Sequence, residues 1–169
     1  MANTQAMSTS FMGKLMTGTH NFGTGVIRAS TAADTYYGAL LLASGTFNAS
    51  SADYTGTVGS VTMSGEVSGS GYTAGGVAIT NATPPTATNS SATAGVAFWT
   101  PSASITYTTV TLATAFDAVM VYNFTQGTGG AYPAVSIHTF GSQTITAGTF
   151  TLTMPSNTTS TALIRLATT

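Results

Sequence analysis

The chain has 169 residues, which is enough for one domain with a core of its own. Only 4% of the residues are charged, three Lys or Arg and four Asp or Glu, against roughly a quarter in an average soluble domain. A nucleic-acid-binding protein needs a basic patch to neutralise phosphates, and the three scattered cations (Lys14, Arg28 and Arg165) argue strongly against that class.

The composition also argues against several other classes. There is no Cys, so neither a disulfide framework nor thiolate chemistry is expected. No apolar run approaches the roughly 18–20 residues of a membrane-spanning helix, and the first residues lack the pattern of a signal peptide. Thr, Ser, Gly and Ala replace the missing charges, which favours strands over exposed helices. A surface with so little charge lacks repulsion between copies, which favours a subunit of a larger assembly.

Residues 1–22 are expected to form an N-terminal arm that contains a short amphipathic helix. Apolar residues recur every four positions from Met7, which is the period of a helix. Because Met side chains adapt to irregular partners, this face is a candidate contact surface. The alternative is a helix packed on its own domain. The candidate partner-binding residues of the arm are Phe11, Met12, Leu15 and Met16.

Residues 23–169 are expected to form a single β-sandwich domain. Short runs of β-branched and aromatic residues, bounded by small turn formers, are typical of strands. About eight to ten short strands separated by turn signals fit a β-sandwich or a jelly roll. The expected strands lie at residues 35–47, 60–67, 77–80, 96–100, 105–112, 118–124, 132–140, 149–154 and 162–166. A strand-like segment is expected at residues 26–28 and a brief one at residues 143–145.

Residues 97–124 are expected to organise this domain. Two β-rich runs, 105–112 and 118–124, are joined by residues 113–117, which predicts a central hairpin with Asp117 in its turn. The only Trp lies just before the hairpin in an apolar context and is expected to fill the core. The side chains expected in the core are Trp99, Val119, Val121, Phe150 and Leu152.

Two segments are expected to be exposed loops. Residues 69–76 are rich in Gly, and residues 81–95 have no apolar periodicity and contain adjacent prolines. Because loops often carry binding residues, Tyr72, Pro84 and Pro85 are further candidates for contact with a partner.

No catalytic residue, cofactor site or metal site is expected. Asp34, Asp53 and Glu66 lie in turn-like segments, where solvated surface acids are normal. His138 and Asp117 could join one of many Ser residues in a triad, but no GxSxG motif is present. Two His residues without Cys cannot form a closed zinc site in one chain.

Three segments resemble a family of small structural proteins of tailed bacteriophages. They are AFWTPSASITYTTVTLATAFDAVMVYN at residues 97–123, AVSIHTFGSQTITAGTFTLTMP at residues 134–155, and ALIRLAT at residues 162–168. Two N-terminal pieces, NTQAMSTSF and FGTGVIRASTAADTYYGALLLASG, are similar to the same family. The resemblance implies a non-enzymatic virion component that is assembled in the bacterial cytoplasm.

The role that best suits these implications is a capsid decoration (cement) protein. Its expected partners are the major capsid protein and copies of itself, in a dimer or trimer. A tail or fibre component, including a host-binding adaptor, is the main alternative. A third possibility is a carbohydrate-binding β-sandwich, for which Tyr36, Tyr37, Tyr54 and Tyr72 are the candidate stacking residues.

Overall fold

A computed structural model describes residues 3–8, 11, 19–20, 22, 33–80, 85–88 and 96–167. This part of the chain confirms the all-β class, because every element in it is a strand and every strand pair is antiparallel. The expected N-terminal helix falls largely on residues 9–10 and 12–18, outside the described residues. Met7, which was expected on that helix, lies instead in a strand.

The large sheet contains six strands. Its order is β1 (Ala6–Met7), β8 (Tyr132–Leu152), β7 (Ile105–Asn123), β2 (Tyr36–Leu42) and β4 (Val77–Ile79), and β3 (Asp53–Tyr54) pairs separately with β8. The N-terminal arm therefore contributes an edge strand to the sheet.

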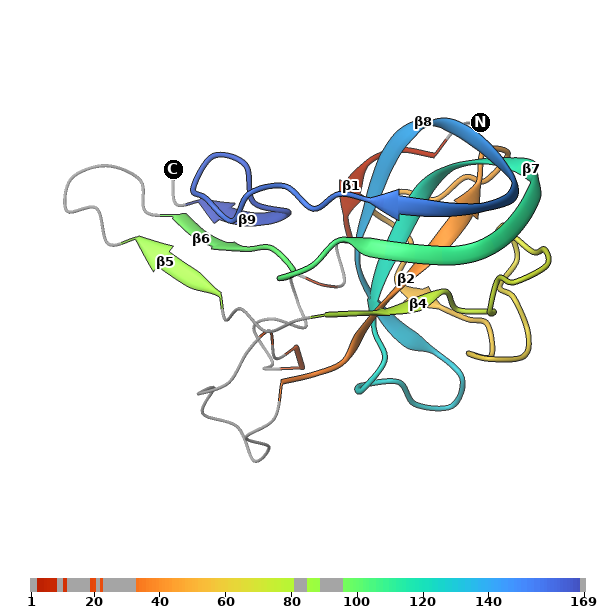
Figure 1. The fold of residues 1–169 in the computed structure, drawn as a ribbon. Coiled ribbons are helices and arrows are strands. Elements are labelled where there is room, and N and C mark those ends of the chain that lie inside the picture. Colours follow the sequence, from red (N-terminus) through yellow and green to blue (C-terminus); the bar gives the residue numbers. More distant parts are fainter. Residues whose placement is uncertain are drawn as a thin grey trace.

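A smaller sheet lies beside the large one (Figure 1). Its order is β5 (Thr86–Thr88), β6 (Val96–Trp99) and β9 (Ile164–Ala167). Strand β5 falls in the segment expected to be an exposed loop, where Thr86 pairs with Phe98. Its Thr-Ala-Thr sequence contains the β-branched residues that strands favour. The adjacent prolines before it had suggested a loop instead.

The expected central hairpin at residues 105–124 is wrong. These residues form one continuous strand, β7, and Asp117 lies within it rather than in a turn. Likewise, the three strands expected between residues 132 and 154 form one strand, β8. The hairpin is instead made by β7 and β8, and its turn contains Gly129 and Gly130, both with positive φ.

Repeated β-bulges bend this long hairpin. The register of β7 against β8 shifts at five places, and two non-glycine residues there have positive φ, Thr109 at 54° and Ala147 at 48°. A bulge adds an unpaired residue to one strand and increases its local bend and twist. Figure 1 shows the result, a hairpin that curves along its length. Because of the bend, both halves of β7 contribute side chains to one core, from Tyr107 to Val121.

The centre of the large sheet is buried on both faces. Leu40 of β2 and Val119 of β7 belong to the first core cluster, whereas Leu41 and Met120 belong to a second cluster on the opposite face. This alternation follows from the two-residue period of a strand. It also explains the continuous apolar run of β2, which lies within the strand expected at residues 35–47.

The irregular segment 43–76 covers the second core cluster. It contributes Phe47, Tyr54 and Met63 to that cluster and contains only one short strand, β3. The strand expected at residues 60–67 is absent from this described segment, which has only isolated bridges near Val61 and Glu66. Gly65 has a φ of 83°, which interrupts an extended conformation there.

Candidate functional site

A buried carboxylate organises the irregular segment. Glu66 is only 4% exposed, and its two oxygens accept four hydrogen bonds. Oε2 accepts from the Tyr54 hydroxyl and the Met63 N–H, both at 2.8 Å. Oε1 accepts from the Tyr72 hydroxyl at 2.8 Å and from the Gly75 N–H at 2.7 Å. The expectation that Glu66 is a solvated surface acid is therefore wrong.

All four donors belong to the irregular segment 43–76, which covers the second core cluster. Burial raises the pKa of the Tyr54 hydroxyl well above its usual range, and its hydrogen bond to Glu66 raises it further. Burial also raises the pKa of Tyr72. Both hydroxyls therefore stay protonated and act as donors at neutral pH. This network stabilises a loop arrangement rather than assembling reactive groups.

Asp34 is a second buried acid, and the expectation of a solvated residue is wrong here too. Its carboxylate accepts hydrogen bonds from the Asn123 side chain at 2.8 Å and from Gln126 Nε2 at 3.1 Å. Asn123 also contacts His20 Nδ1 at 3.1 Å. These contacts attach the end of β7 to the chain that enters β2, so the cluster supports the start of the hairpin turn.

Ser136 and His138 form a hydrogen-bonded pair on β8. The Ser136 Oγ lies 2.8 Å from His138 Nε2, as expected for residues two apart on one face of a strand. Burial lowers the pKa of His138 to about 4, so the imidazole is neutral at pH 7. Asp117, the other triad candidate, accepts instead from Asn3 Nδ2 at 2.6 Å. Within the described residues, no carboxylate is hydrogen-bonded to His138 to orient it as a base.

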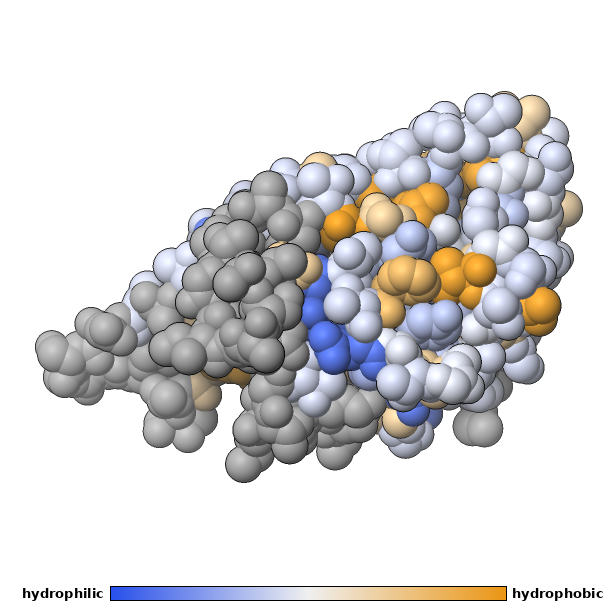
Figure 2. All heavy atoms as spheres, turned by 90° about the horizontal axis from the view of Figure 1, so that it is seen from below, coloured by the Kyte–Doolittle hydropathy of each residue, from blue (hydrophilic) through white to orange (hydrophobic). Residues whose placement is uncertain are grey.

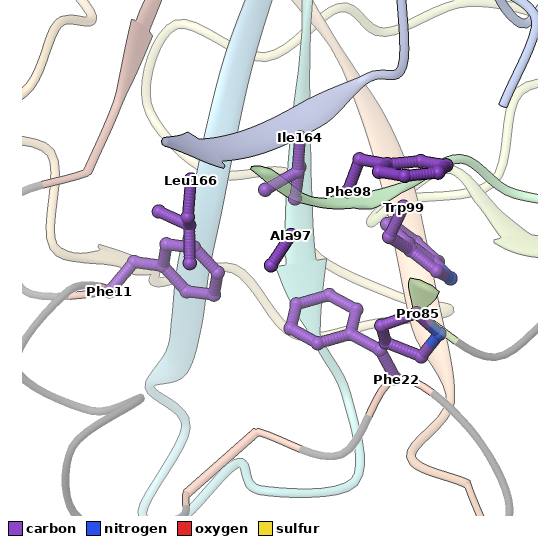
Figure 3. A pocket seen from close by; sticks show the side chains of 8 residues that line it. All are labelled: Phe11, Phe22, Pro85, Ala97, Phe98, Trp99, Ile164 and Leu166. Atoms are coloured by element: carbon purple, nitrogen blue, oxygen red, sulfur yellow. The ribbon is translucent and has the colours of Figure 1, made fainter. Parts of the chain in front are cut away.

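An apolar cavity of about 180 Å³ lies between the small sheet and the N-terminal part of the chain. Side chains of β6 and β9 line it on one side, and Phe11, Phe22 and Pro85 line the other (Figure 3). The lining residues from the two strands are Ala97, Phe98, Trp99, Ile164 and Leu166. Leu166 is 40% exposed. None of the described lining residues has a hydroxyl, amide or charged side chain.

The partner-binding candidates are scattered rather than gathered in one site. Phe11 is fully buried and packs against Phe22, with ring centroids 5.8 Å apart, so it is not available to a partner in this structure. Tyr72 is held by its hydroxyl, which donates to Glu66 and accepts from the Leu40 N–H. Pro85 is exposed at the cavity. Met12, Leu15, Met16 and Pro84 lie outside the described residues.

The expected core residues lie in or against the first core cluster. Trp99, Val119 and Val121 are buried members of it. Phe150 and Leu152 are half-buried and pack against it. Trp99 contacts Phe22, with ring centroids 4.7 Å apart, so it joins the small sheet to the N-terminal part of the chain.

The long hairpin carries a single charged residue, Asp117, which is half-buried and bound by Asn3. No charged residue occurs between Asp117 and Arg165, and the exposed positions of β8 are mainly Thr, Ser, Gln and Gly. On the face shown in Figure 2, most of the described residues have intermediate hydropathy, with a few apolar patches and a small polar group. Such a surface offers hydroxyls, methyls and backbone groups for contact.

Comparison of the chain with protein-family models, curated proteins and solved structures found no match. In the described ranges, no group of three or more His, Asp or Glu residues could hold a metal ion. No helix among the described residues is long and apolar enough to cross a membrane.

Glu66 is the organising residue that the sequence failed to reveal. The sequence does contain one signal of burial. Glu66 is the only charged residue between Asp53 and Asp117, and it lies beside Val67 and near Met63. An isolated acid in such a setting suggests burial with dedicated hydrogen-bond donors.

Proposed function

We propose that this protein is a non-enzymatic structural component of a tailed-bacteriophage virion, with capsid decoration as its most specific role. The sequence resemblance of residues 97–123 and 134–155 supports the virion assignment. The observation that carries the proposal is the long β7–β8 hairpin, whose exposed face is uncharged and rich in Thr. Its partners in this role are the major capsid protein and further copies of itself.

A neutral surface suits this role for a physical reason. Covering a charged group with a neighbour removes its hydration, which costs free energy unless a partner charge replaces the water. Thr hydroxyls and methyls can be covered at a smaller cost. Many weak contacts, repeated over the copies on a shell, then add up through multivalency.

We interpret the curved large sheet and the small sheet together as a distorted sandwich. The first core cluster lies between them and includes Leu112 and Val119 of β7 as well as Ile164 of β9. In this interpretation the rim of the apolar cavity, at Pro85 and Leu166, is the described surface best suited to accept an apolar side chain of a capsid protein.

The test is co-sedimentation of the purified protein with phage heads that lack it. Deleting the N-terminal arm is not informative, because Asn3 and Phe11 belong to the fold. Leu166→Ser is expected to weaken head binding, whereas Val61→Ser, at a residue that is 58% exposed, serves as the matched control. If the wild-type protein does not bind heads, the decoration role is wrong. Imaging that places the protein on the tail would favour the tail or fibre alternative.

The carbohydrate-binding alternative loses support from the structure. A sugar-stacking surface needs exposed aromatic rings, but Tyr36 and Tyr54 are fully buried. Tyr72 is fixed by Glu66. A glycan array without hits would remove this possibility.

A further inference from the structure

One edge of β8 is unpaired over much of its length. On one side β8 pairs with β7 from end to end. On the other side its only strand partners in the described part of the chain are β3, at Tyr132 and Pro133, and β1, at Ser136 and Ile137. Over the far half of the strand, no described strand pairs with the backbone N–H and C=O groups of this edge.

This edge lacks the charges that normally prevent pairing between copies. Natural edge strands are commonly protected by Lys, inward-facing charges, Pro or bulges. Here the nearest prolines are Pro133 and Pro155, at or beyond the strand ends, and the chain has no charge between Asp117 and Arg165. The bulge at Ala147 limits the regular part of the free edge to residues 148–152.

The side chains of this short run are self-complementary. Thr149 and Thr151 are exposed on one face, whereas Phe150 and Leu152 lie half-buried on the other. In an antiparallel pair centred on Phe150, Gly148 would face Leu152 of the second copy. The small residue would then leave room for the large one. The two exposed Thr residues would face each other across the pair.

We propose that residues 148–152 pair antiparallel with the same residues of a second copy, with the two-fold axis at Phe150. The large sheets of the two molecules then join into one continuous sheet. A two-fold contact uses the same patch twice, so an uncharged, self-complementary edge is suited to it. The inference rests on the proposed function, in which many copies are bound to one shell. Such copies lie close together, and their high local concentration strengthens a short contact.

Sedimentation velocity over a range of concentrations tests the pairing. The wild-type chain is expected to show a concentration-dependent dimer. Thr149→Lys combined with Thr151→Lys places like charges opposite each other twice and is expected to weaken the dimer at least about tenfold. Thr149→Lys combined with Thr151→Glu places opposite charges at the same positions and is the matched control, expected to retain the dimer. Both Thr side chains are exposed, so circular dichroism should show unchanged folding.

Cross-linking tests the register. The chain has no Cys, so introduced thiols are unique. A mixture of Thr149→Cys and Thr151→Cys chains is expected to form a disulfide-linked heterodimer in preference to either homodimer. A wild-type protein that stays monomeric at every concentration, or equal association of the two charged variants, overturns the proposal. A wild-type protein that binds heads but forms no dimer refutes the edge pairing alone. A wild-type protein that dimerises through this edge but does not bind heads refutes the cement role alone.

Discussion

Replacement of Glu66 by Gln tests whether a buried carboxylate holds the irregular segment in place. The substitution keeps the size of the side chain but turns one oxygen acceptor into an NH2 donor. Each oxygen accepts one hydroxyl and one backbone N–H: Tyr72 and Gly75 donate to Oε1, and Tyr54 and Met63 donate to Oε2. Whichever oxygen is replaced, two donors lose their acceptor.

The expected cost follows from these partners. A Tyr hydroxyl can rotate and accept from the new NH2 group, but a backbone N–H cannot. One buried N–H without an acceptor costs about 1–3 kcal/mol. The remaining bonds also lose the strength that a charged acceptor gives them. Relief from burying a charge offsets part of the loss. Glu66→Gln should therefore lower the free energy of unfolding by about 2–4 kcal/mol, whereas a solvated acid would change it by no more than about 0.5 kcal/mol.

Urea unfolding, followed by circular dichroism and by the fluorescence of Trp99, measures this difference. Two companion variants sharpen the assay. Tyr54→Phe removes one donor to Glu66, but Tyr72→Phe also leaves the Leu40 N–H without the hydroxyl that it reaches at 3.0 Å. Tyr72→Phe should therefore cost about 1 kcal/mol more than Tyr54→Phe.

A double-mutant cycle between Glu66→Gln and Tyr54→Phe measures the interaction energy between these two side chains, separately from their contacts with other residues. Because the two side chains interact directly, the double variant should lose less stability than the sum of the single variants. If Glu66→Gln changes the free energy of unfolding by less than about 0.5 kcal/mol, the carboxylate does not hold the segment and the reasoning is refuted.

Three further predictions concern other parts of the fold. Burial lowers the pKa of His138 from 6.5 to about 4. Between these two values the unfolded chain binds a proton that the folded chain does not. The free energy of unfolding should therefore fall by up to about 3 kcal/mol as the pH drops from about 6.5 to 4. An NMR titration of the imidazole checks this, and a pKa near 6.5 would contradict it. Gly76→Ala places a Cβ against the Gly38 carbonyl oxygen and should cost at least about 3 kcal/mol in urea unfolding. The control Gly129→Ala shares a positive φ but meets no atom within 4 Å, so about 1 kcal/mol is expected; equal costs would refute the clash. Asn3→Ala breaks three hydrogen bonds between the arm and the body. The free energy of unfolding should fall by about 2 kcal/mol, and the thermal midpoint should fall with it. An unchanged midpoint would show that these bonds do not hold the arm.

Strands with a locally complete signal could be predicted from the sequence. The short runs of β4 and β6 were predicted within one residue of their observed bounds, and the start of β2 was predicted equally well. The predicted end of β2, at residue 47, lies beyond its observed end at Leu42. Each of these strands has a dense cluster of apolar residues beside a turn former, so the information lies within a few residues of the chain.

The length of β7 and β8 could not be predicted in the same way. Residues 113–117 interrupt the apolar pattern of β7, which suggested a turn, but the strand continues through them. The interruption reflects bulges, at which the two-residue period shifts without ending the strand. An interrupted apolar pattern occurs both at a bulge within one strand and at a turn between two strands. The two cases differ in how the partner strand is paired, which the pattern of one strand does not reveal.

The buried acids were missed for a different reason. Glu66 lies in a stretch rich in Gly and Ser that is typical of an exposed segment, whereas its donors include Tyr54 and Gly75, which only the folded chain brings together around it. Asp34 is similar, because Asn123 lies far from it in sequence. Sequence context describes the neighbours in the chain, and burial depends on the neighbours in space.

The distribution of charge links this fold to the proposed assembly. Asp34 and Glu66 lie in the interior, where hydroxyl, amide and backbone donors stabilise them, and Asp117 is held by Asn3. Three of the four acids thus fix the arm, the hairpin and the irregular segment. The exterior of the hairpin is left with Thr and Ser, which a neighbour can cover without stripping the hydration from a charge. The same composition weakens the electrostatic repulsion between copies, which suits the assembly proposed above.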